Sequence, residues 1–166
     1  MGGHVIMYLN GPLLWAANIM KIAAQSSCES ETHEASRATK NGLFMRNLIT
    51  NNRRRLVGPT LMLGDNAAMM DVIKHEGAST RTRYFDRVTL LVKRAYQLLM
   101  VDPTLITTDN MIADIFTKST DKGTFCKMRN AMMNINSTLV HALESSLCAF
   151  HGATKKLMSH LFDRVN

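Results

Sequence analysis

Strand-like runs of apolar residues alternate along this chain with longer segments of helical periodicity, and this alternation constrains the fold more than any other feature. A chain that alternates in this way is expected to form an α/β domain, in which helices cover a sheet. The first run, His4 to Leu9, is followed by Asn10 and Gly11, which favour a tight turn, and by a second run from Pro12 to Ala16. The amino end is therefore predicted to be a β-hairpin.

The remaining elements follow from apolar spacing and from the turn-forming residues between them. Two further strands are predicted, from Pro59 to Leu63 and from Leu98 to Ile106. Pro103 lacks a backbone donor, so the second of these strands is expected at a sheet edge. Apolar positions at helical spacing predict helices over Cys28–Ile49, Ala67–Lys74, Tyr84–Tyr96, Asn110–Thr117 and Gly123–Met133, with a further amphipathic pattern over Ser137–Phe162.

The charge balance indicates an anionic partner. The 20 Lys and Arg residues outnumber the 13 Asp and Glu residues, giving a net charge of +7, and small basic domains commonly bind nucleic acid. The basic run Arg53, Arg54 and Arg55 is either a contact for the phosphates of a duplex or a solvated loop, and both interpretations stay open. No apolar stretch reaches the roughly 18 residues of a membrane span, so no membrane partner is expected.

Three acidic residues stand at the predicted ends of elements. Glu31 lies in the first turns of the long helix, Asp65 follows the third strand, and Asp114 lies in a late short helix. Carboxylates at such positions can converge, and hard divalent cations such as Mg²⁺ bind oxygen ligands of this kind. Each acid also has an ordinary explanation, as a helix-start acid, a helix cap or a surface residue.

Several short motifs around these acids occur in the same order as the motifs of a known protein family. Residues 26–31 (SSCESE) resemble the family motif S-S-T-E-A-E-Y, residues 64–68 (GDNAA) resemble C-D-N-Q-S-A, and residues 110–118 (NMIADIFTK) resemble N/D-x-x-A-D-I-L-T-K. Residues 42–48 and 81–86 are similar to A-L-W-L-R-x-L and R-T-K-H-I-D, and the hairpin up to Trp15 resembles a G-Y-V-F stretch that ends in S-W. This ordered set of motifs resembles the ribonuclease H domain of copia-type retrotransposon polyproteins, and the resemblance covers about residues 2–133.

This resemblance implies a ribonuclease H-like mixed sheet flanked by helices over residues 1–133, followed by a C-terminal helical extension over residues 134–166. It implies hydrolysis of the RNA strand of RNA/DNA hybrids by two-metal catalysis with Mg²⁺ or Mn²⁺. Glu31, Asp65 and Asp114 inherit the roles of catalytic, metal-binding carboxylates. Asn66, within the second motif, and the basic run Arg53, Arg54 and Arg55 are the candidate nucleic-acid-binding residues.

One family acid has no counterpart here. It lies on a central first strand, in an S-D-x-D-W-A-like motif more than ten residues before the G-Y-V-F stretch, and residues 1–28 hold no Asp or Glu. We therefore expect the central first strand to be missing and the chain to be inactive or impaired as a nuclease. The hairpin should either pair directly with the strand around Leu61 or leave two open edges. Further departures are Tyr84 for a family histidine and Ser119 for a family proline.

The implied partners are an RNA/DNA hybrid or other nucleic acid and the reverse transcriptase domain of the parent polyprotein. The implied location is intracellular, either cytoplasmic within a virus-like particle or nuclear. Two alternatives stay open: a non-catalytic module that binds nucleic acid, and an inert transposon relic. Binding that depends strongly on salt, without cleavage, would identify the binding module.

Overall fold

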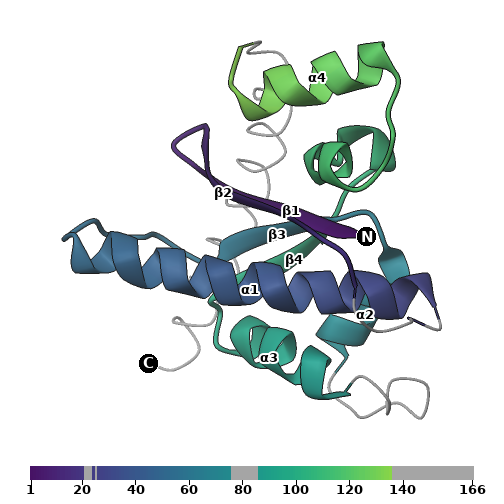
Figure 1. Ribbon diagram of the computed structural model, residues 1–166. Helices are drawn as coiled ribbons and strands as arrows, with labels where there is room; N and C mark the ends of the chain where they lie inside the picture. Colours follow the sequence, from purple (N-terminus) through teal and green to yellow (C-terminus); the bar gives the residue numbers. More distant parts are fainter. Residues whose placement is uncertain (21–23, 25, 76–85, 136–166) are drawn as a thin grey trace, which may run out of the picture.

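The computed structural model describes residues 1–20, 24, 26–75 and 86–135 (Figure 1). The predicted start of the helix at Tyr84 and nearly all of the extension over residues 134–166 lie outside the described residues. The described part is a mixed α/β structure, as predicted. Its elements are β1 (Gly2–Tyr8), β2 (Gly11–Asn18), α1 (Ser27–Asn51), β3 (Thr60–Gly64), α2 (Ala67–Lys74), α3 (Asp86–Gln97), β4 (Val101–Leu105), η1 (Thr108–Asn110), η2 (Ile112–Phe116) and α4 (Lys122–Met132), where η marks 3₁₀ helices.

The predicted hairpin is present, with its turn one residue earlier than expected. β1 and β2 pair antiparallel, with Val5 opposite Trp15 and Tyr8 opposite Gly11. Leu9 and Asn10 form the turn, and both have positive φ, 49° and 62°. Two successive positive φ values match the twist of an antiparallel pair, and asparagine tolerates this conformation better than most residues.

The four strands form two separate pairs rather than one sheet. β3 and β4 are parallel, with Met62 opposite Pro103, and β4 is at an edge as Pro103 predicted. Among the described strands, β1 bonds to β2 and β3 bonds to β4, and no pairing joins β1 to β3. Each of these two strands therefore keeps one edge that no described strand covers.

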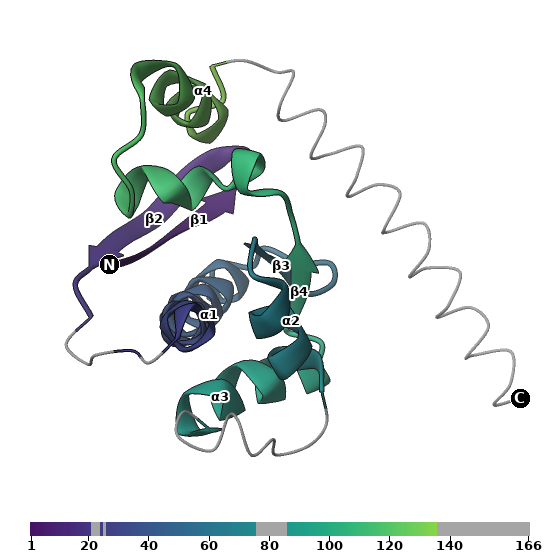
Figure 2. The ribbon, with the colours of Figure 1, turned by 90° about the vertical axis from the view of Figure 1, so that its right-hand side faces the viewer.

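Helix α1 is the element against which both strand pairs pack (Figure 2). It begins after Ser26, whose hydroxyl accepts a hydrogen bond from the Glu29 amide at 3.1 Å. On the hairpin side, the His4 ring lies 2.6 Å from Glu34 Oε1 through Nδ1 and 2.9 Å from the Asn41 amide nitrogen through Nε2. On the β3 side, the Arg46 guanidinium donates to Thr60 Oγ1 at 2.8 Å.

The face that α1 buries is largely polar. Its buried residues are Thr32, Glu34, Ala35, Ser36 and Thr39. Later in the helix, two apolar side chains are exposed, Phe44 at 62% and Leu48 at 45%. The helix predicted from apolar spacing is therefore present, and most of the residues that it buries are polar.

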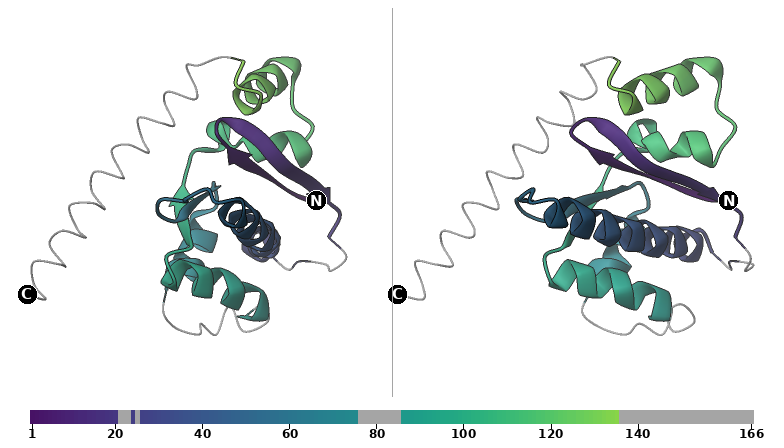
Figure 3. Two further views of the ribbon diagram at one scale, coloured as in Figure 1. Left: turned by 90° about the vertical axis from the view of Figure 1, so that its left-hand side faces the viewer. Right: turned by 60° about the vertical axis from the view of Figure 1, so that its left-hand side comes forward.

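The apolar core lies on the other side of α1 from the hairpin, between α1, α2, α3 and β3. It consists of Ala35, Met69, Met70, Ile73 and Val92, with Met62, Cys28 and Tyr96 packed against it. Figure 3 shows the hairpin between α1 and the layer formed by η2 and α4. The molecule thus has a second, thinner packing layer above the hairpin.

Residues 110–117, predicted as one helix, form short 3₁₀ turns instead. Met111 is extended, with φ −77° and ψ 90°, and separates η1 from η2. The amides of Asp114 and Thr117 bond to the carbonyls of Met111 and Asp114 at 3.1 and 3.0 Å. Hydrogen bonds between residues three positions apart are typical of the short 3₁₀ helices that connect longer elements. Here η2 packs against strand β1 of the hairpin.

Gly3 allows that close approach. A Cβ atom at position 3 would lie 2.8 Å from Thr117 Cγ2 and 2.9 Å from Phe116 Cβ. Phe116 Cβ is attached directly to the backbone and cannot swing away, so η2 itself would have to move. The position of Asp114 in η2 therefore depends on a glycine in β1.

We expect Gly3→Ala to lower the free energy of unfolding by about 1–3 kcal/mol, because the added methyl group overpacks the contact with η2. Gly42→Ala is the matched control, since a Cβ at this position in α1 meets nothing within 4 Å. That substitution should raise stability by about 0.5–1 kcal/mol through helix propensity. Urea denaturation of both variants measures the difference, and an equal effect of the two would contradict the packing of η2 on β1.

Candidate carboxylate site

Glu31, Asp65 and Asp114 come from three different elements. Glu31 lies in the second turn of α1, Asp65 directly follows β3, and Asp114 belongs to η2. The pKa of Glu31 is raised by partial burial of its carboxyl group, next by the negative charge of Asp65, and also by that of Asp114. The structure therefore brings the three predicted acids into one electrostatic neighbourhood.

Lys118 joins this group, and it has no role in the sequence-based assignment. Its ammonium donates to Asp114 Oδ2 at 2.8 Å, and its backbone amide donates to the Asp114 carbonyl at 2.9 Å. The pKa of Lys118 is raised, first by the hydrogen bond to Asp114 and also by the negative charges of Asp65 and Glu31. We call Glu31, Asp65, Asp114 and Lys118 the carboxylate cluster.

The three acids differ in exposure. Asp114 is buried, Asp65 is half-buried, and Glu31 is exposed as a residue although its carboxyl group is partly covered. Water therefore screens the repulsion at Glu31, and its cost to stability is small. The positive charge of Lys118 acts in the opposite direction and lowers the pKa of Glu31.

Asn66 has a structural task beside Asp65. Its Oδ1 accepts a hydrogen bond from the Met69 amide at 3.0 Å and caps the amino end of α2. Asn66 is therefore the N-cap residue of α2, and the carboxylate of Asp65 does not cap this helix. A contact between Asn66 and nucleic acid would have to come from its amide nitrogen.

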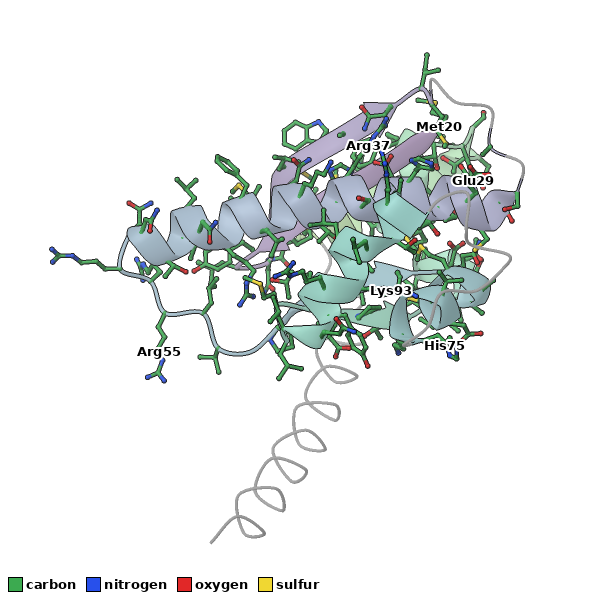
Figure 4. The ribbon with its side chains drawn as sticks, turned by 90° about the horizontal axis from the view of Figure 1, so that it is seen from below. Met20, Glu29, Arg37, Arg55, His75 and Lys93 are labelled. Atoms are coloured by element: carbon green, nitrogen blue, oxygen red, sulfur yellow. The ribbon has the colours of Figure 1, made fainter. Side chains whose placement is uncertain are left out.

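The basic run lies far from the carboxylate cluster. Arg53, Arg54 and Arg55 are exposed residues just beyond the carboxyl end of α1. Glu31 is near the amino end, roughly 35 Å away at 1.5 Å per helical residue. Figure 4 shows Arg55 projecting at one end of α1 and Glu29 at the other. The predicted nucleic-acid-binding arginines are therefore not part of the same site.

The donor set has the chemistry that a hard divalent cation prefers, because all three acids offer carboxylate oxygens. Among the residues that the structure describes, however, no three His, Cys, Asp or Glu side chains lie close enough together to hold a metal ion. One carboxylate oxygen of Asp114 is already bonded to an ammonium. The residue types fit Mg²⁺ or Mn²⁺, while the arrangement is more open than a formed metal site.

No family model matches this chain, and no solved structure matches it. In the described part of the chain, no helix combines the length and the apolar character needed to cross a membrane.

Replacing Glu31 with Gln should raise the free energy of unfolding at pH 7 by about 0.3 kcal/mol, a small gain because the residue is exposed. The raised pKa means that ionised Glu31 costs stability above that pKa. The gain should therefore disappear as the pH falls below the ordinary value of 4.5. Urea denaturation at pH 7 and pH 4 measures the change.

Glu29→Gln provides the comparison, because Glu29 lies in the first turn of α1 and favours the positive end of the helix. This variant should lose stability at pH 7, by about 0.3–1 kcal/mol. If both variants shifted stability in the same direction at pH 7, the repulsion assigned to Glu31 would be wrong.

Proposed function

We propose that the chain is part of a ribonuclease H-like domain of a copia-type retrotransposon polyprotein, with Glu31, Asp65 and Asp114 as its metal-binding carboxylates. Its substrate would be the RNA strand of an RNA/DNA hybrid, and its metal Mg²⁺ or Mn²⁺. The family has a further acid on a central strand, and residues 1–28 hold no Asp or Glu that could replace it. This chain would therefore have little or no nuclease activity. Its partners would be nucleic acid and the reverse transcriptase domain of the same polyprotein.

The observation that carries this proposal is that two acids far away in the sequence, Asp65 and Asp114, both raise the pKa of Glu31. Glu31 is affected by both Asp65 and Asp114, across 34 and 83 positions of the chain. Ordinary helix-start, capping and surface roles do not require such a convergence. The cap of α2 is Asn66 rather than Asp65, and Asp114 is buried rather than on the surface, so the ordinary explanations of these two acids are weakened.

The arrangement of strands supports the same proposal. β1 and β3 both pack against α1, each with an edge that no described strand covers. A single further strand could bond to both edges and convert the two pairs into one mixed sheet. Such a strand would end near Asp65 if it ran parallel to β3, and an acid on it would then face the cluster.

A bound divalent ion would supply an activated water and neutralise charge on the cleaved phosphate. Glu31, Asp65 and Asp114 would hold that ion through their carboxylate oxygens. Asp114 is buried and fixed by η2, so its carboxylate is pre-positioned. Glu31 is more exposed, so its side chain can change conformation. Such freedom would let its carboxylate bind the metal ion while the substrate enters the site.

A non-catalytic nucleic-acid-binding module is the second candidate, and the exposed basic run favours it. The separation of roughly 35 Å along α1 between the arginines and Glu31 is close to one turn of a duplex. A hybrid lying along α1 could contact both. The role of the arginines would then be to hold the duplex rather than to complete the cluster.

The decisive experiment adds an upstream strand with the family motif S-D-x-D-W-A to the chain. Without the added strand, the chain should show no cleavage of RNA/DNA hybrid in Mg²⁺ or Mn²⁺. The extended chain should melt at a higher temperature, because the new strand pairs with β1 and β3, and it should cleave the hybrid. Melting is followed by circular dichroism and cleavage by gel electrophoresis.

Two matched variants of the extended chain separate the strand from its acid. Replacing both aspartates of the motif with asparagine should abolish cleavage and keep the higher melting temperature. Asp65→Asn in the extended chain should also abolish cleavage. Cleavage by the chain as given, lost in Asp65→Asn, would show that no further acid is needed, and an extension that raised neither melting temperature nor activity would refute the assignment.

A further inference from the structure

One face of β2 carries large apolar side chains that are exposed. Leu13 and Trp15 are 42% and 60% exposed, whereas the neighbouring Leu14 and Ala16 are less exposed. Side chains two residues apart in a strand point to the same face of the sheet. Leu13 and Trp15 therefore form one exposed apolar strip, which we call the β2 strip. Exposed apolar surface of this kind often marks an interaction site.

The β2 strip lies on the face of the hairpin that already carries a helical layer. Trp15 is opposite Val5 in the antiparallel pair, and residues directly opposite each other share a face. Val5 shares that face with Gly3, which is two positions earlier in β1. Gly3 is the residue that η2 approaches closely. Helix η2 therefore packs over β1 on this face, while the β2 strip beside it is exposed.

Helix α4 ends in a turn that stops it close to the hairpin. Asn134 has a positive φ of 54°. Its amide donates to the Ala131 carbonyl at 3.3 Å, and the Ile135 amide donates to the Asn130 carbonyl at 2.8 Å. These two bonds form a Schellman motif, so the residues after Ile135 do not continue α4. Figures 1 and 3 show this end of α4 near the turn of the hairpin, where β2 begins.

The sequence that follows α4 predicts an amphipathic helix over residues 137–162, which lie outside the described part of the chain. Its apolar residues recur at spacings of three, four or seven positions, at Leu139, Leu143, Leu147, Phe150 and Leu157. This spacing places them in one stripe of a helix, with Glu144, Ser145 and Lys155 away from it. Such a helix would be about 39 Å long, and the 8 residues of β2 span about 26 Å, so the segment is long enough to cover the strand.

We propose that residues 137–162 form a helix that packs on the exposed face of β2, with its apolar stripe against Leu13 and Trp15. This helix would extend the layer that η2 and α4 form on the same side of the hairpin (Figure 3). The segment is joined to α4, so its docking is intramolecular and takes place at a high effective concentration. The inference does not depend on the proposed nuclease function.

Trp15 is the single tryptophan of the chain, so its fluorescence reports directly on the β2 strip. In the full chain, Trp15 should emit at a shorter wavelength than an indole in water and be quenched weakly by acrylamide, because the helix excludes water. Leu147→Asp places a charge in the apolar stripe and should shift the emission to longer wavelength and strengthen quenching. Ser145→Asp is the matched control, since it adds the same charge away from the stripe and should change neither quantity.

Two further measurements separate docking from other causes of the same signal. Leu147→Asp should keep the cooperative urea transition of the domain, and the milder Leu147→Ala should give a smaller shift in emission of the same sign. Protection of Trp15 should not depend on protein concentration. Protection that increases with concentration would assign the strip to a second copy of the chain and overturn the intramolecular docking. An emission typical of exposed indole in the full chain, unchanged by Leu147→Asp, would also overturn it.

Discussion

The buried hydrogen bond between His4 and Glu34 is the interaction on which the position of the site depends. Both side chains are almost fully buried, and Asn41 contacts the other nitrogen of the His4 ring. A buried polar pair of this kind is costly to break, because one desolvated group would remain without its partner. The bond fixes β1 on α1, and η2 then packs on β1 at Gly3. Asp114 is thereby brought towards Glu31 through a chain of contacts rather than through direct bonding.

Much of the local structure could be predicted from the sequence. The bounds of α2 were predicted to the residue, and α1 and β3 within two residues, because capping residues, turn residues and apolar spacing act over short distances. The edge position of β4 followed from Pro103. These features need no knowledge of what packs against them.

Other features could not be predicted, for identifiable reasons. The pairing of His4 with Glu34 joins residues 30 positions apart, and no periodicity marks it. Most of the residues that α1 buries are polar, and apolar spacing does not mark such positions. Residues 110–117 have helical spacing but form 3₁₀ turns, because packing on Gly3 sets their path. Lys118 is the last residue of the motif over residues 110–118, yet its contact with Asp114 depends on the fold of η2.

The central claim is that acids from three elements act as one cluster, and a pH titration of the Glu31 carboxyl carbon by nuclear magnetic resonance tests it most directly. Neutralising Asp65 by Asp65→Asn removes a negative charge that raises the pKa of Glu31. Glu31 should therefore titrate at lower pH in Asp65→Asn than in the unchanged chain. Asp71→Asn, which alters an exposed acid of α2, should leave the titration of Glu31 unchanged. An identical Glu31 titration in all three proteins would contradict the claim that the acids converge.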